Sequence, residues 1–173
     1  AIAKQHRPML VNAYDNSVRY TDYVLSKIID YLGSLENTSS ALLYCADHGE
    51  DLIDDHRERF LHASPTTTAY QLYVASLAWF SESYRERFPE KVAAAEANAT
   101  APATTHALFH TMADMASIRG RFLTTKVSLV SPDFDRTAPR RYLNDHNEAV
   151  PYRKTGLRPE DMEVFRRYGI ELN

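Results

Sequence analysis

The sequence comprises 173 residues, of which 44% are hydrophobic and 25% charged, so its length fits one domain and its composition argues against disordered, collagen-like and coiled-coil proteins. Lys and Arg number 20 against 23 Asp and Glu, and the net charge of -3 gives no general signature of nucleic-acid binding. The lone cysteine, Cys45, excludes an intrachain disulfide and a CxxC metal site. No apolar run reaches the roughly 20 residues of a membrane span, no signal peptide is visible, and the missing initiator Met suggests a piece of a longer protein.

The first half of the chain predicts one long helix followed by one strand. Apolar residues recur at helical spacing over 12–32, and Gly33 stands where a C-terminal cap belongs. A polar loop over 34–40 precedes six apolar residues, 41–46, which predict a fully buried strand of the kind found in parallel sheets. The highly charged segment 51–59 is expected to be a solvated loop.

The middle of the chain predicts a second strand and two helical regions. A buried strand is expected within 72–80, and a helix over 83–97 should break at Pro89. An amphipathic helix follows over 104–118, and the short apolar segment 127–130 is a candidate third strand.

The last part of the chain, from about 132 to 173, is rich in Pro, Arg and Asp and is expected to be largely irregular. It should end in a short helix with Pro159 in its first turn, Glu160 and Asp161 beside the positive end of the helix dipole, and Gly169 as its stop. Helices that alternate with buried strands predict an α/β sandwich. Two convincing strands are few for such a sheet, so either further strands escape the pattern or the sheet is incomplete in this chain.

The residues that follow the first predicted strand carry the sharpest chemical signal. Asp47 and His48 lie at the carboxyl end of the strand, where open α/β sheets gather their ligands. A carboxylate oxygen and an imidazole nitrogen are both good zinc ligands, and Gly49 would let the backbone turn so that the two side chains converge. His62 could return to the same place. Local spacing alone leaves a second interpretation open, in which Asp47 and Glu50 cap a helix and His48 lies on the surface.

An ordered set of motifs resembles a known enzyme family. The segment 12–23 (NAYDNSVRYTDY), the tetrapeptide 47–50 (DHGE) and the pair Leu61-His62 resemble the second half of the catalytic domain of phosphoethanolamine transferases. These sulfatase-like enzymes of the alkaline phosphatase superfamily are anchored in the inner membrane of Gram-negative bacteria and face the periplasm. The resemblance covers most of residues 9–130 and includes Leu108-Phe109-His110-Thr111. It implies an alkaline-phosphatase-like α/β fold for this chain.

The resemblance also implies a cofactor, a reaction and roles for particular residues. Asp47 and His48 match the family's zinc pair, and His62 matches the histidine that binds the substrate phosphate or a second zinc. His48 is expected to bind metal through one ring nitrogen and to donate a hydrogen bond from the other, and Glu50 is a candidate supporting group. In the family, a zinc-activated threonine takes phosphoethanolamine from phosphatidylethanolamine, and a hydroxyl of a lipid or glycan then accepts it.

Two departures from the family pattern indicate how much of the catalytic domain this chain contains and which members it resembles. The nucleophilic threonine precedes the 12–23 helix in the family, and Thr66, Thr67 and Thr68 follow the Asp-His pair instead. The lipid A members of the family carry several disulfides, whereas this chain has only Cys45. We therefore expect residues 1–173 to be the C-terminal part of a sulfatase-like catalytic domain, inactive alone, with an apolar sheet edge or face exposed.

Several alternatives remain open at this level. The chain also fits a sulfatase or phosphoglycerol transferase of the same superfamily, and a fragment with only a structural or binding role is a third possibility. His106 and His110 lie four residues apart on a predicted helix, where a partly buried pair is the favoured interpretation over a metal site. The basic pairs at 140–141, 153–154 and 166–167 are interspersed with acidic residues and are expected to lie on a solvated surface.

Overall fold

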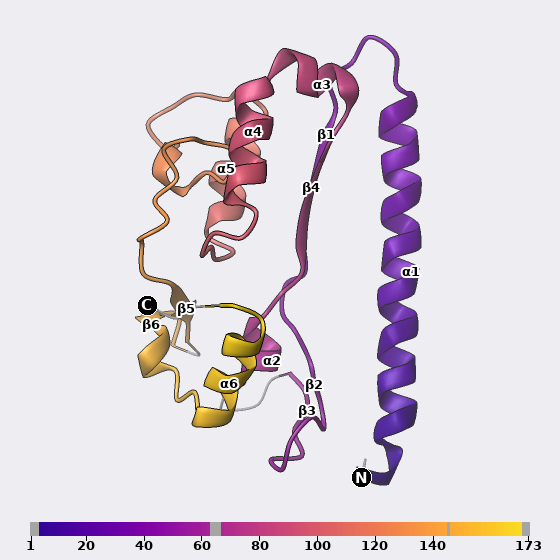
Figure 1. Ribbon diagram of the computed structural model, residues 1–173, viewed down its shortest axis with the longest axis vertical. Helices are drawn as coiled ribbons and strands as arrows, with labels where there is room; N and C mark the ends of the chain where they lie inside the picture. The colour runs from indigo at the N-terminus through magenta and orange to yellow at the C-terminus, as the bar shows by residue number, and fades with distance from the viewer. Residues whose placement is uncertain (1–3, 63–66, 145, 171–173) are drawn as a thin grey trace.

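The computed structural model describes residues 4–62, 67–144 and 146–170, which form helices and three separate two-stranded antiparallel sheets (Figure 1). The strands pair as β1 with β4, β2 with β3, and β5 with β6. In chain order the elements are η1 (Lys4–His6), α1 (Arg7–Ser34), β1 (Ala41–Cys45), β2 (Asp51–Leu52), β3 (Phe60–Leu61), α2 (Ala69–Leu72), β4 (Ser76–Phe80), α3 (Glu82–Arg87), α4 (Pro89–Asn98), α5 (Ala107–Met115), η2 (Thr125–Val127), β5 (Arg141–Leu143), β6 (Ala149–Pro151), η3 (Tyr152–Lys154) and α6 (Pro159–Arg167).

The β1–β4 ladder runs along the middle of the molecule, with α1 on one side and α4, α5 and α6 on the other (Figure 1). Ala41 lies opposite Phe80 and Cys45 opposite Ser76 in an antiparallel register. The prediction of a strand over 41–46 is correct. The expected full burial and parallel pairing are wrong, because β1 pairs antiparallel and is only half-buried. A six-residue apolar run gives no information on strand direction, and β4 is its sole strand partner within the described residues.

Helix α1 is longer than the apolar pattern predicts and contributes no buried residue. Pro8 occupies its first turn, where a missing N–H costs nothing, and the helix continues through Gly33 to a cap at Leu35. The expected stop at Gly33 is therefore wrong, since Gly33 lies inside the helix, against the Trp79 ring. Large apolar side chains stay exposed along it, namely Met9, Val18, Tyr20, Tyr23, Val24, Ile28 and Tyr31. Even so, no helix in the described part of the chain is long and apolar enough to cross a membrane.

A compact core lies on the other side of the ladder, centred on Phe80, Tyr84, Val92, Met115 and Val130. Ser81 caps α3 by accepting a hydrogen bond from the Tyr84 N–H, and the break before Pro89 separates α3 from α4 as predicted. The Tyr84 hydroxyl donates to the Met115 carbonyl at 2.7 Å. Burial raises the pKa of Tyr84 to about 12.

The candidate strand over 127–130 does not form. The 3-10 helix η2 covers its first residue, and a turn follows that inserts Val130 into the core. Side chains, and not a neighbouring strand, make the hydrogen bonds to the backbone of this segment. The Thr111 hydroxyl accepts from the Leu129 N–H at 3.0 Å, and the Asn98 amide donates to the Leu129 carbonyl at 3.1 Å.

The C-terminal part of the chain contains the β5–β6 hairpin and α6 within otherwise irregular structure. Helix α6 begins at Pro159 and is stopped by Gly169, as predicted. Gly169 has a φ of 67°, a left-handed conformation that glycine adopts without steric cost, and the Ile170 N–H closes the end by donating to the Phe165 carbonyl. Asp161, expected only to face the helix dipole, is instead fully buried.

Candidate metal centre

Two consecutive turns place the predicted site residues at one end of the β1–β4 ladder. Strand β1 ends at Cys45, and the residues from Asp47 to Glu50 lead into β2. The β2–β3 hairpin then reverses the chain, so that His62 returns beside Glu50. Two segments twelve residues apart thereby supply one cluster of polar side chains.

Asp47 and His48 converge in the structure. The His48 Nδ1 lies 3.1 Å from the Gly49 carbonyl oxygen, which only accepts hydrogen bonds, so Nδ1 carries the proton in the neutral ring. The other nitrogen, Nε2, is left as the ligand atom and lies 3.6 Å from the Asp47 Oδ2. Two zinc ligands at about 2.1 Å and a tetrahedral angle lie about 3.4 Å apart, so this spacing suits one ion.

Glu50 links the two histidines. Its Oε1 lies 2.9 Å from the His62 Nδ1 and 3.8 Å from the His48 Nδ1, and the two imidazole rings are 3.8 Å apart between centroids. One ligand atom from each of these three residues falls within 4.8 Å of the others. The second oxygen, Oε2, is buried without a hydrogen-bond partner among the described residues. A nitrogen and oxygen donor set with an unsatisfied buried carboxylate oxygen fits a cation such as zinc.

The electrostatics at Asp47 favour the charged form that a metal ligand requires. The side chain is 88% exposed. A hydrogen bond from the His48 N–H to Oδ1, at 3.0 Å, lowers the pKa of Asp47, and the nearby imidazoles add to this effect. Asp47 is therefore ionised at neutral pH and accessible from solvent.

Position 49 requires glycine because the backbone of α2 and the residue after it passes too close for a side chain. A Cβ at this position would lie 1.9 Å from the Tyr70 carbonyl oxygen and 3.2 Å from that of Tyr73. The Gly49 N–H donates to the Gln71 carbonyl at 2.9 Å, which fixes the turn against α2. Its φ is not in the left-handed region. The expected role in a tight turn is thus replaced by a different one, namely close contact between two backbones.

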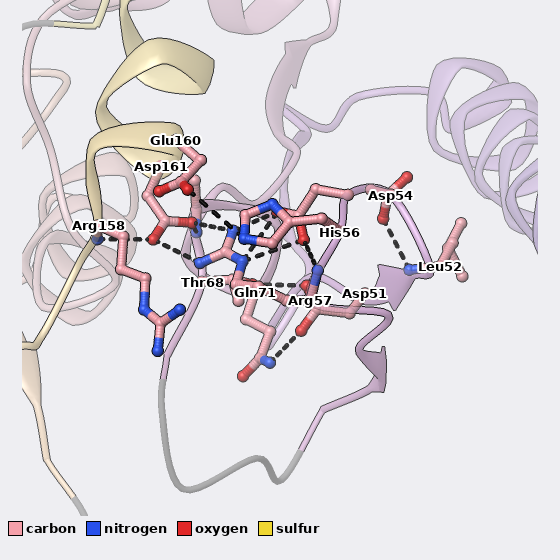
Figure 2. A network of polar contacts seen from close by, with 12 residues as sticks. Asp51, Leu52, Asp54, His56, Arg57, Thr68, Gln71, Arg158, Glu160 and Asp161 are labelled. Carbon is pink, nitrogen blue, oxygen red and sulfur yellow. Dashed lines mark hydrogen bonds and ion pairs between the residues drawn. The ribbon is translucent and has the colours of Figure 1, made fainter. Parts of the chain in front are cut away.

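A buried ion cluster attaches the β2–β3 hairpin to α6 (Figure 2). The Arg57 guanidinium donates two hydrogen bonds of 2.8 Å to the Asp161 carboxylate and further bonds to Asp55. The Arg57 side chain is 5% exposed and that of Asp161 is 0% exposed. The Asp161 carboxylate also accepts the N–H groups of Ala69 and Arg158, at 3.0 and 2.9 Å. The hairpin that carries Glu50 and His62 is therefore fixed by a helix about 100 residues away in the sequence.

Two smaller sets of contacts fix the start of the hairpin. Asp51 is buried and accepts hydrogen bonds from the Thr68 hydroxyl, at 2.7 Å, and from the Gln71 amide (Figure 2). On the other side, Arg7 of α1 donates to Asp54 at 3.0 Å. The expectation that 51–59 is a solvated loop is wrong, because most of these charges have partners in other elements. Composition alone gives no sign of those partners.

The hairpin backbone is strained. Ile53, Glu58 and Leu61 have φ values of 59°, 50° and 57°, in the left-handed region that non-glycine residues rarely adopt. The Ile53 N–H donates to the Arg59 carbonyl at 2.9 Å, and its own carbonyl accepts from Arg7 at the same distance. Tertiary contacts thus hold a conformation that the local sequence does not favour.

The other singled-out residues lie away from this cluster. His110 is buried and accepts the Thr124 N–H at 3.2 Å, whereas His106 is exposed, so only one member of that pair is buried. The Thr67 hydroxyl donates to the Tyr142 hydroxyl and that of Thr68 to Asp51, so neither contacts the cluster of His48, Glu50 and His62. Thr66 lies outside the described residues.

The ion cluster predicts a loss of stability in acid. Burial favours a raised pKa for Asp161, but hydrogen bonds from Arg57 and two backbone N–H groups outweigh it and hold the pKa below its ordinary value. Hydrogen bonds from Arg57 also lower the pKa of Asp55. Because the folded-state values lie below the unfolded ones, the stabilisation is complete above about pH 5 and is lost as pH falls through the folded-state values, below about pH 4.

We expect the Tm of the chain to stay level from neutral pH to about pH 5 and to fall steeply below about pH 4. Asp161→Asn should start from a lower Tm and show a shallower acid decline, because one of the linked carboxylates is gone. Scanning fluorimetry across this range measures both curves. Parallel acid declines in the two proteins would contradict the assignment to Asp161.

Comparisons with known proteins agree with one another. A family model described as Sulfatase matches residues 3–118. The phosphoethanolamine transferase EptA of Salmonella typhimurium is 31% identical over 127 residues, which cover 71% of this chain and 23% of that protein. The C-terminal periplasmic domain of phosphoethanolamine transferase EptC from Campylobacter jejuni aligns with a TM-score of 0.65 and 25% identity, over 75% of this chain and 40% of that one. The corresponding EptC domain from Escherichia coli, in complex with Zn, aligns with a TM-score of 0.69 and 22% identity, over 89% of this chain and 42% of that one.

Proposed function

The chain belongs to the sulfatase family, and from that premise we propose that it is part of a zinc-dependent phosphoethanolamine transferase. Its α/β fold is alkaline-phosphatase-like, as the solved EptC domains show, which confirms the fold expected from the sequence. The chain spans 23% of the length of EptA and less than half of each EptC domain. We propose that residues 1–173 form the C-terminal part of a catalytic domain, because the motifs over 12–62 resemble the second half of that domain in the family.

The observation that carries the proposal is the cluster of His48, Glu50 and His62, with a buried, unsatisfied Glu50 oxygen. Asp47 is not part of this cluster, but its Oδ2 lies 3.6 Å from the His48 Nε2. Asp47 Oδ2 and His48 Nε2 would hold zinc. Bound zinc activates a hydroxyl nucleophile by favouring its alkoxide form. The Zn complex of the EptC domain from Escherichia coli supports this choice of metal.

The remaining residues of the cluster would orient and bind the substrate. Glu50 accepts a hydrogen bond from the His62 Nδ1, which fixes that ring and leaves its Nε2 as the acceptor of the neutral ring. His62 would contact the phosphate of the donor lipid or a second zinc. The nucleophile of the proposed reaction is a threonine, which in the family precedes the segment that residues 12–23 resemble.

The proposed reaction moves phosphoethanolamine from phosphatidylethanolamine to a hydroxyl of a lipid or glycan. The protein would be anchored in the inner membrane of a Gram-negative bacterium, with this part in the periplasm. The relatives are named phosphoethanolamine transferases, which supports the proposed reaction. The solved relatives are named periplasmic domains, which supports the proposed location. The match to the Sulfatase model also fits a sulfatase of the same superfamily, and the transferase names of the relatives weigh against that alternative.

The test of the metal assignment uses the transferase that contains this chain. Asp47→Ala and His48→Ala should abolish phosphoethanolamine transfer and the bound zinc, with little change in Tm because both side chains are partly or largely exposed. His106→Ala, at an exposed histidine outside the cluster, is the matched control. Metal analysis, transfer assays and thermal melts measure the three effects. A fully active Asp47→Ala enzyme would end the proposal.

A second expectation concerns residues 1–173 alone. Zinc sites use three or four protein ligands, and only Asp47 and His48 are assigned to the metal here, with His62 binding either the phosphate or a second zinc, so the ion would keep most of its water. We expect weak zinc binding by calorimetry and no turnover of a chromogenic phosphodiester. Tight stoichiometric zinc together with turnover by a monomer would show that the site is complete in this chain.

A further inference from the structure

A cavity of about 590 Å³ lies on the side of the β1–β4 ladder opposite α1. Its walls come from β4, from the segment between α4 and α5, and from α6, elements that Figure 1 shows around one side of the ladder. The volume falls within the range of about 300–1,000 Å³ that small-molecule sites occupy. None of His48, Glu50 and His62 lines it, so the cavity is separate from the metal cluster.

The lining is mainly apolar and aromatic. Leu72 of α2 and Ala78 of β4 line it on one side. Phe165 and Tyr168 of the C-terminal region face them, and the Tyr168 ring stacks on Tyr73 at 5.3 Å between centroids. Such a surface suits an alkyl chain better than a polar metabolite.

Three charged side chains line the cavity, namely Arg85 and Glu96, which pair with each other at 3.4 Å, and Arg140. The Arg140 Nε is buried and has no hydrogen-bond partner among the described residues, and no carboxylate there forms an ion pair with it. An unpaired cation in partly apolar surroundings is unfavourable unless an anion accompanies it. Burial lowers the pKa of Arg140, and the adjacent Tyr152 partly opposes this effect.

We propose that this cavity binds an amphiphile whose single anionic oxygen headgroup pairs with Arg140 and whose alkyl chain packs between β4 and α6. The fork of guanidinium N–H groups matches a carboxylate or a phosphate, and the pairing satisfies the buried Nε. A fatty acid and a lysophospholipid-like phosphate monoester share this chemistry. The site is additional to the proposed transferase centre, and its test requires no zinc.

The test measures binding of decanoate, decyl phosphate and decanol to the full chain by calorimetry, each below its critical micelle concentration. Arg140→Gln should lower the affinity for both anions by about tenfold and leave the affinity for decanol unchanged, because only the charged pair is lost. Arg121→Gln, at an exposed arginine, is the matched control. The anion with the larger loss on Arg140→Gln identifies the headgroup.

A cavity-filling variant tests the place of the alkyl chain. Ala78→Phe should weaken the binding of all three probes, since the new ring occupies the cavity beside β4. If this variant fails to fold by circular dichroism, Ala103→Phe fills the cavity from the segment between α4 and α5. Anion affinities unchanged by Arg140→Gln, or probe affinities unchanged by a folded cavity-filling variant, would overturn the proposal.

Discussion

Arg57→Ala is expected to lower the free energy of unfolding by about 3–5 kcal/mol, the usual cost of removing one partner from a buried ion pair. The loss leaves the fully buried Asp161 carboxylate, which now accepts two hydrogen bonds from Arg57, with only its two backbone donors. The same change releases the β2–β3 hairpin from α6, so the zinc affinity of the complete transferase should fall as well. Urea unfolding followed by circular dichroism measures the first effect, and zinc titration the second.

Two further variants separate the role of this pair from a general effect of losing an arginine. Asp161→Asn keeps an oxygen acceptor and should cost less than Arg57→Ala. Arg121→Ala removes an exposed arginine and should change stability by less than about 0.5 kcal/mol. A cost below about 1 kcal/mol for Arg57→Ala would mean that the hairpin does not depend on α6.

Gly49→Ala is expected to destabilise the protein by about 3 kcal/mol, at the upper end of overpacking costs. The new Cβ would meet the backbone carbonyl of Tyr70 at 1.9 Å, and a backbone atom cannot rotate away as a side chain can. Relief requires the turn to move off α2, which would displace His48 and Glu50 together. We therefore expect the zinc affinity of the complete transferase to fall even at temperatures where the variant stays folded.

Gly33→Ala is the matched control for this substitution. Its Cβ would meet only the Trp79 ring, at 3.8 Å, an ordinary contact within α1. Alanine is favoured over glycine inside a helix by roughly 0.5–1 kcal/mol, so stability should rise. Equal effects of the two substitutions on unfolding and on zinc binding would contradict the special role of Gly49.

Some features that depend on local chemistry were predictable from the sequence, although the helix stop expected at Gly33 was not correct. The break at Pro89 and the limits of α6 follow from proline and glycine geometry, which acts over one or two turns of chain. The direction of β1 was not predictable, because an apolar run reads the same in a parallel and an antiparallel sheet. The missing strand over 127–130 shows the same limit, since Val130 is buried from a turn.

The candidate site divides in the same way. Asp47 and His48 are neighbours in the sequence, so their convergence needs only a turn after a strand, and their role as ligands remains a prediction. The sequence predicted only a supporting role for Glu50 and did not predict its position between two histidines. The pairing of Arg57 with Asp161 joins residues 104 positions apart and leaves no local pattern. Neither residue could have been assigned to the site before the structure placed α6 beside the hairpin.

The left-handed conformations of Ile53, Glu58 and Leu61 bear on the order in which the molecule assembles. Each costs roughly 1–2 kcal/mol that an isolated segment has no means to offset. A synthetic peptide of residues 47–62 should therefore sample other backbone conformations and not hold His48, Glu50 and His62 together. During folding, the ligand geometry would arise late, once α1, α2 and α6 have docked. The proposed metal site is in this sense a product of tertiary structure and not a preformed local motif.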